Sequence, residues 1–91
     1  MNKEDIRKGI IVYYARILKQ TSIYEVCELY IRTVEDDYFV GTDKHDKHAY
    51  IFSYNALNKY IFKERKTCLK TVLAAEKNAP KISLETDYEE Y

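Results

Sequence analysis

Residues 23–34, IYEVCELYIRTV, place apolar side chains at alternating positions over most of their length. Four odd-numbered residues, Ile23, Cys27, Leu29 and Ile31, are apolar, whereas the even-numbered set includes charged residues. Successive side chains of a β-strand point to opposite faces of the sheet, so a period of two indicates a half-buried strand. We therefore expect a strand over these twelve residues with its odd-numbered face in the core.

Four further segments carry strand patterns. Residues 10–19 are apolar on both parities apart from Arg16, which is typical of a strand that is central or covered on both faces. Three short aromatic segments separated by polar turns complete the set: residues 38–42, 49–54 and 59–62. Gly41 lies inside the first of these three and predicts either a bulge or a close approach of the backbone.

Residues 64–77, ERKTCLKTVLAAEK, change to a helical period. Cys68, Leu69, Val72 and Leu73 form one apolar stripe, and Pro80 disfavours helical geometry just beyond it. The sequence therefore predicts an α+β, mainly β fold: a small SH3-like curled antiparallel sheet of about five strands with one C-terminal helix. Curling such a sheet hides strand edges that would otherwise pair with other chains.

The length of 91 residues fits one domain of modest stability. Residues 1–77 carry fourteen Lys and Arg against eleven Asp and Glu, a net charge of +3, and residues 78–91 carry −3. We expect one domain over residues 1–78, followed by an acidic and mobile tail over residues 79–91. A net charge of +3 is weaker than that of a dedicated nucleic-acid-binding domain.

The N-terminus, MNKEDIRKG, is too polar for a secretory signal, and no apolar run approaches the roughly 20 residues that cross a membrane. The two cysteines, Cys27 and Cys68, do not form a Cys-x-x-Cys pair, and a small secreted domain usually has more. We expect a cytoplasmic protein without membrane contact, in which both thiols are reduced and packed as small apolar groups.

The segment DKHDKH, residues 43–48, admits two interpretations. His45 and His48 could bind a metal from a loop together with Asp43 or Asp46, but on a strand a spacing of three would turn them to opposite faces. The alternative is the polar turn of a hairpin between residues 38–42 and 49–54. No second group of ligands lies nearby in the sequence, so the turn is favoured, and we expect no metal and no cofactor.

Catalytic motifs are absent from the sequence. It contains no Gly-rich phosphate loop, no Gly-x-Ser-x-Gly elbow and no His-Glu-x-x-His pair. Cys27 lies on the apolar parity of its strand, where a thiol packs rather than reacts. The sequence therefore gives no support to an enzyme.

Ten tyrosines and no tryptophan favour strand-building, because Tyr suits pleated, half-buried surfaces, and a recognition surface is the alternative. Small barrels bind nucleic acid by stacking bases on aromatic rings in a basic groove, but here acidic residues are interleaved on the same strands. A protein-binding surface anchored by Tyr and Arg fits these facts more easily, and nucleic acid is the alternative. The candidate binding residues are Tyr13, Tyr14, Arg16, Tyr24, Tyr30, Arg32, Lys44, His45, Lys47, His48 and Tyr50.

Residues 55–78, NALNKYIFKERKTCLKTVLAAEKN, read as a turn, a short strand and an Arg-containing helix start. The pattern is carried by Lys59, Ile61, Phe62, Arg65, Cys68 and Leu69. It resembles the C-terminal segment of small proteins encoded by phages and mobile elements of Gram-positive bacteria, and residues 23–41 are similar to the same group. The resemblance implies an accessory protein that binds and inhibits a host protein, in the manner of an anti-defence or anti-CRISPR protein.

Overall fold

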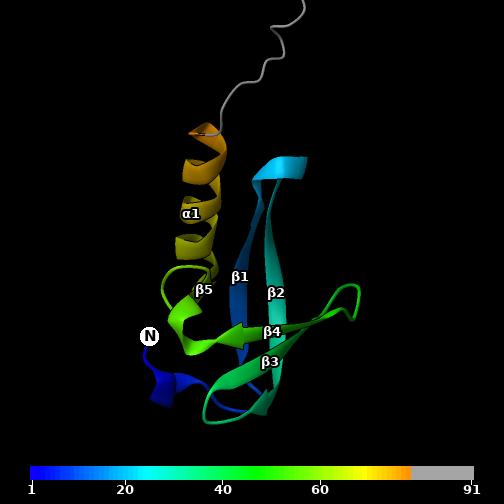
Figure 1. Ribbon diagram of the computed structural model, residues 1–91, viewed down its shortest axis with the longest axis vertical. Coiled ribbons are helices and arrows are strands. Elements are labelled where there is room, and N and C mark those ends of the chain that lie inside the picture. The colour runs from blue at the N-terminus through cyan, green and yellow to red at the C-terminus, as the bar shows by residue number, and fades with distance from the viewer. Residues whose placement is uncertain (79–91) are drawn as a thin grey trace, which may run out of the picture.

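The computed structural model describes residues 1–78, which form one five-stranded antiparallel sheet and one α-helix (Figure 1). Spatially, the strands follow the order β4-β3-β2-β1-β5. The elements are β1 (Ile11–Leu18), β2 (Ile23–Val34), β3 (Tyr38–Asp43), β4 (Ala49–Ser53), β5 (Ile61–Phe62) and α1 (Arg65–Lys77). The predicted α+β, mainly β fold is confirmed as a curled sheet that does not close into a barrel. Residues 79–91, including the predicted tail, lie outside the described residues.

Strand β2 is the longest and organises the sheet. It pairs with β1 over Ile23–Tyr30, but with β3 only over Leu29–Val34. The register shifts between Ile31 and Thr33, and a bulge of this kind bends a strand. The β3–β4 ribbon therefore crosses in front of β1 and β2 (Figure 1). Residues 23–28 of β2 and the residues 13–18 of β1 that pair with them extend beyond this ribbon, and we call this two-stranded segment the arm.

Three short 3₁₀ turns flank the strands. They are Lys3–Asp5 before β1, Lys19–Thr21 between β1 and β2, and Tyr54–Ala56 between β4 and β5. The first lies within the polar N-terminal segment. The second forms the tip of the arm, and Ser22 after it adopts the left-handed conformation with a φ of 57°. The third joins β4 to β5, where the side chain of Ser53 accepts a hydrogen bond from the Asn55 amide.

The inner face of the curled sheet holds the larger core. Val12, Leu29, Ile31, Phe39 and Ile61 are fully buried there. Cys27 lies on the same face of β2, so the predicted odd-numbered core face is confirmed. Strand propensity and burial therefore agree along β2, because every second side chain enters this core.

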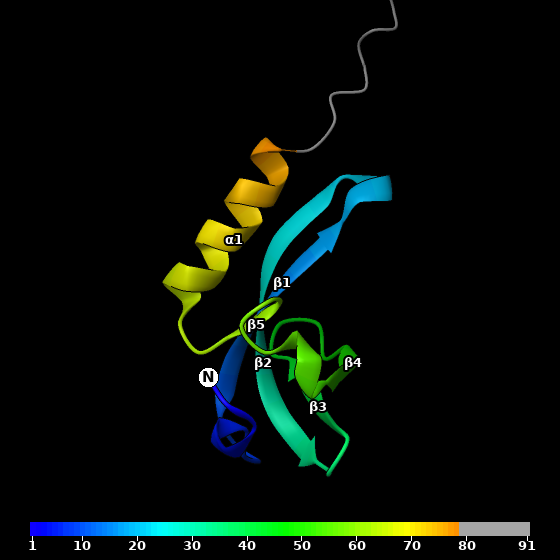
Figure 2. The ribbon, with the colours of Figure 1, turned by 60° about the vertical axis from the view of Figure 1, so that its left-hand side comes forward.

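The outer face of the arm holds a second, smaller core beneath α1. Ala15 of β1, Phe62 of β5, and Cys68 and Val72 of α1 are buried together. Figure 2 shows α1 running alongside the arm. Both faces of β1 are therefore covered, as its two apolar parities indicate. Of the apolar stripe expected on the helix, only Cys68 and Val72 are buried.

Gly41 shows the close backbone approach that was one of its two predicted roles. A Cβ atom at this position would lie 3.1 Å from Cδ1 and 3.2 Å from Cβ of Leu29. The bulge itself lies on the partner strand, between Ile31 and Thr33. Glycine at position 41 thus lets β3 pack closely on a fully buried leucine.

Candidate functional site

The DKHDKH segment forms the connection between β3 and β4, as predicted for a polar turn. Asp43 is only 7% exposed, and its Oδ1 accepts hydrogen bonds from the amides of His45 (2.7 Å) and Asp46 (3.3 Å). Asp46 in turn accepts one from the amide of His48 (2.9 Å). Lys47 takes the left-handed conformation with a φ of 65°. The carboxylates of Asp43 and Asp46 therefore stabilise the turn by accepting hydrogen bonds from its backbone amides.

The histidines of this loop are both exposed. Within residues 1–78, no group of three or more His, Cys, Asp or Glu side chains is arranged to hold a metal ion. The ring of His48 instead packs on Tyr50, with a distance of 5.1 Å between ring centroids. Its visible role is an aromatic contact.

Aromatic rings gather on the inner face next to this loop. Tyr14 contacts Tyr50 and Phe52 with centroid distances of 5.2 Å and 4.9 Å, both in edge-to-face geometry. Burial raises the pKa of the Tyr14 and Tyr50 hydroxyls above the usual 10, although nearby Arg16 opposes the shift. Both side chains therefore remain neutral phenols near pH 7. The rings pack against one another, which leaves fewer faces free for a ligand to stack on.

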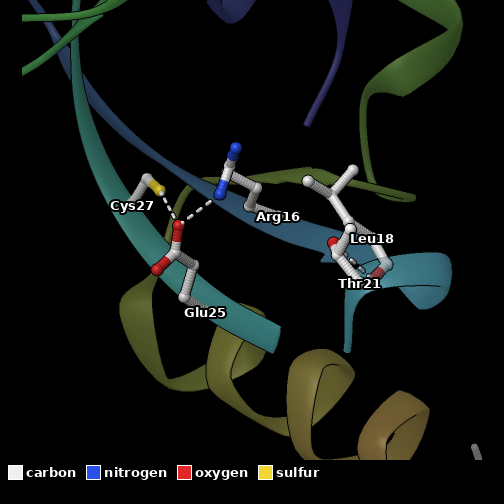
Figure 3. A network of polar contacts seen from close by, with 5 residues as sticks. All are labelled: Arg16, Leu18, Thr21, Glu25 and Cys27. Atoms are coloured by element: carbon white, nitrogen blue, oxygen red, sulfur yellow. Dashed lines mark hydrogen bonds and ion pairs between the residues drawn. The ribbon is translucent and has the colours of Figure 1, made fainter. Parts of the chain in front are cut away.

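Arg16 stands beside these rings and is paired across the strands with Glu25. Its Nη1 lies 2.8 Å from Oε2 of Glu25, and this bond raises the pKa of the guanidinium further (Figure 3). Figure 3 also shows the Cys27 thiol directed at the same oxygen, at 3.9 Å. Burial, followed by the charge of Glu25, raises the pKa of Cys27 to about 12. The thiol is therefore protonated at neutral pH and unsuited to nucleophilic chemistry.

A second cation of the predicted binding set is also paired. Lys44 Nζ lies 3.2 Å from Oε2 of Glu28. A hollow of about 410 Å³ opens beside this pair, and four acids, Glu25, Glu28, Asp43 and Asp46, line it together with Lys44 and Arg65. The side chains around this hollow therefore carry more negative than positive charge.

The outer face of β2, β3 and β4 beyond α1 carries a different surface. Ile51 is 73% exposed, and it lies opposite half-buried Val40 in the β3–β4 register. Tyr30 and Tyr38 are also exposed on the same face, and exposed Arg32 lies at the bulge of β2. We call these five residues the outer patch: Tyr30, Arg32, Tyr38, Val40 and Ile51. The helix covers the other end of the sheet and leaves this end bare (Figure 2).

The structure distributes the predicted binding residues over four places. Tyr14, Arg16, His48 and Tyr50 come together on the inner face, and Lys44, His45 and Lys47 lie in the loop. Tyr13 and Tyr24 are half-buried against the core beneath α1. Tyr30 and Arg32 belong to the outer patch.

The sequence reasoning did not single out Ile51 and Tyr38. The signal for Ile51 was present, because Ala49, Ile51 and Ser53 alternate with Tyr50 and Phe52 along β4. Only one of these two faces could enter the core, and the aromatic face is the larger. An isoleucine on the remaining face is therefore exposed.

No protein-family model, curated protein or solved structure matches this chain. The fold and surface define a class: a small α+β domain with an open, curled antiparallel sheet, one helix on the outer face of its arm, and an apolar patch at the end of the sheet that the helix leaves bare. Within residues 1–78, no helix has the length and apolar character to cross a membrane.

Proposed function

We propose that this protein is a non-catalytic module that binds another protein through the outer patch. One observation carries the proposal: Ile51 is 73% exposed on the edge strand β4, opposite half-buried Val40, and exposed Tyr30 and Tyr38 lie on the same sheet face. Exposed apolar patches with polar borders are typical of interaction sites, and Tyr and Arg are frequent anchors of interfaces. The resemblance to phage and mobile-element proteins adds that the partner belongs to the host and that binding inhibits it.

The patch also indicates the chemistry of its partner. Arg32 forms no ion pair with an acidic side chain in the described part of the chain. A partner that covers the apolar side chains would gain from a carboxylate opposite this guanidinium, because an unpaired buried charge is costly. We therefore expect an apolar partner surface that carries at least one acidic residue.

Nucleic acid fits the surface less well. Arg16 beside the aromatic rings and Lys44 in the loop are each engaged by a carboxylate, at 2.8 Å and 3.2 Å respectively. Phosphate binding would have to break these pairs. The acidic hollow beside the loop would also repel a phosphate backbone.

The proposal is tested by site-specific photo-crosslinking in the cell that makes the protein. A benzoylphenylalanine at position 51 should capture one defined protein, and the same probe at exposed Lys70 of α1 should not. The captured protein, once purified, should bind the Ile51→Asp variant about 10-fold more weakly or worse. Leu18→Asp, at a side chain 39% exposed on the arm, is the matched control and should keep full affinity.

Two results would contradict the proposal. Equal capture from positions 51 and 70 would show that the patch has no specific partner. Micromolar binding of oligonucleotides that weakens steeply with salt, together with no capture at position 51, would favour nucleic acid instead.

A further inference from the structure

The arm has an open strand edge. The carbonyl of Glu28 accepts a hydrogen bond from the amide of Lys44, so the backbone groups of Glu28 point away from β1. Because these directions alternate along a strand, the N–H and C=O groups of Tyr24 and Val26 point the same way. β3 pairs with β2 only from Leu29 onward. In the described part of the chain, no strand therefore lies beside Tyr24 and Val26 on this side.

Exposed leucines of α1 lie on the same side of the arm. Arg65 lines the hollow beside this edge together with Val26 and Glu28. Residues four apart share one line along a helix, so Leu69 and Leu73 continue from Arg65 along the open edge. Leu69 is 36% and Leu73 is 53% exposed. The edge is thus accompanied by an apolar row on the helix above it.

We propose that two copies of this chain associate through these edges, with β2 pairing antiparallel to β2 of the second copy about a two-fold axis. When Tyr24 lies opposite Val26 of the other copy, the free N–H and C=O groups of both residues on both chains pair with one another. Open edges of this kind are templates for pairing with a further strand. A two-fold interface is self-complementary, so one sequence supplies both sides.

The helix positions fit this arrangement. α1 packs on both β1 and β2, which places its axis over the space between them. Neighbouring strands lie about 4.8 Å apart, so a continuous sheet would place the two helix axes about 9.6 Å apart, two strand spacings. Packed helices prefer interaxial distances of about 8–10 Å. The rows of Leu69 and Leu73 would then meet each other and be removed from water.

The charges are compatible with the same register. Glu25 would face Glu25 of the second copy, and the Arg16 bound to each at 2.8 Å balances the two carboxylates. The pairing would end at Ile23 of each copy, since Ser22 is left-handed with a φ of 57° and the edge beside Glu28 is already occupied by Lys44.

Sedimentation equilibrium of the full chain tests the proposal from about 1 to about 500 μM. The wild type should be a dimer in this range, and Leu73→Lys should raise the dissociation constant about 10-fold or more while leaving the melting temperature of the monomer unchanged. Ile51→Lys, at a side chain 73% exposed in the outer patch, is the control and should keep the dimer. A wild type that remains monomeric overturns the proposal, as does a dimer lost with Ile51→Lys but not with Leu73→Lys.

A disulfide test gives a second, independent measurement. Position 25 would lie opposite itself in a non-hydrogen-bonded pair, with about 4.5 Å between Cα atoms, which a disulfide can span. Glu25→Cys should therefore form a covalent dimer under mild oxidation. Ser53→Cys, on the outer edge strand β4, should not. Equal cross-linking of both variants would overturn the proposed register and edge.

Discussion

Gly41 offers a direct test of how tightly β3 packs on β2. A methyl group added by Gly41→Ala would lie 3.1 Å from Leu29 Cδ1 and 3.2 Å from Leu29 Cβ. Ordinary carbon contacts lie about 3.5–4.0 Å apart. Leu29 is fully buried, so its side chain can retreat only by displacing other core residues. We therefore expect Gly41→Ala to destabilise the fold.

The magnitude follows from two opposing effects. Overpacking of a well-filled core costs about 1–3 kcal/mol. Replacing glycine by alanine restricts the unfolded chain and returns about 0.4–1 kcal/mol. The Gly41 φ is not positive, so no further backbone strain is added. The net loss should be about 1–2 kcal/mol, which corresponds to a fall in melting temperature of about 4–16 °C for a domain of this size.

Urea denaturation of wild type, Gly41→Ala, Leu29→Ala and the double variant measures this effect. Leu29→Ala removes Cδ1, the nearest Leu29 atom that the new methyl group would meet, and leaves only the contact with Cβ at 3.2 Å. The double variant should therefore lose less stability than the sum of the single changes, with a coupling of about 1 kcal/mol. A Gly41→Ala variant as stable as the wild type, or strict additivity of the two changes, would refute the packing argument.

Three further predictions concern the loop and the inner face. Asp43→Ala removes the acceptor of two loop amides and should lower the free energy of unfolding, measured in urea, by about 2 kcal/mol. Asp43→Asn keeps one acceptor oxygen and should lower it by about half as much. Equal losses would mean that the charge of Asp43, and not its hydrogen bonds, stabilises the loop. Arg16→Met breaks a partly exposed ion pair and should change stability by less than about 1 kcal/mol, so a larger loss would reveal an unrecognised role. Burial raises the pKa of Cys27 to about 12 and of Cys68 to about 11, so the contribution of both thiols to stability should be complete below their ordinary pKa of 9.0 and should decline as the pH rises toward these values. A thiol reagent at pH 8 should therefore react much faster with the denatured than with the native protein, and equal rates would contradict this expectation.

The strands could be predicted because their patterns are local. Cys27, Leu29 and Ile31 follow each other at every second position, and no tertiary information is needed to place them on one face. The same reasoning correctly indicated two covered faces for β1 and a polar turn at residues 43–48. Gly41 within a strand predicted a bulge or a close approach of the backbone, and in the structure Leu29 is the residue that packs closely against it.

The surfaces could not be predicted in the same way, because they depend on how distant elements meet. Tyr13 and Tyr24 lie under a helix that begins 52 and 41 residues beyond them, and although the two apolar faces of β1 indicated a cover, nothing in either strand indicated that α1 supplies it. Asp43 is buried because β3 ends opposite Leu29, beside Cys27 of the core. Leu69 and Leu73 fit a helical stripe, but the arm beneath is only two strands wide and accepts one row, Cys68 and Val72.

The width of the arm links the two proposed interactions and keeps them separable. A two-stranded ribbon is only marginally stable on its own, so α1 must cover one of its faces. This position leaves β3 and β4 without a helix, which exposes Ile51, and it leaves the β2 edge beside Leu73 without a strand. The outer patch and the open β2 edge are thus both exposed because a single helix covers only the arm of a bent sheet. Ile51 belongs to β4 and Leu73 to α1, so a substitution at Ile51 should weaken capture of the partner protein, and a substitution at Leu73 should weaken self-association. If either substitution alone abolished both interactions, the two surfaces would be one.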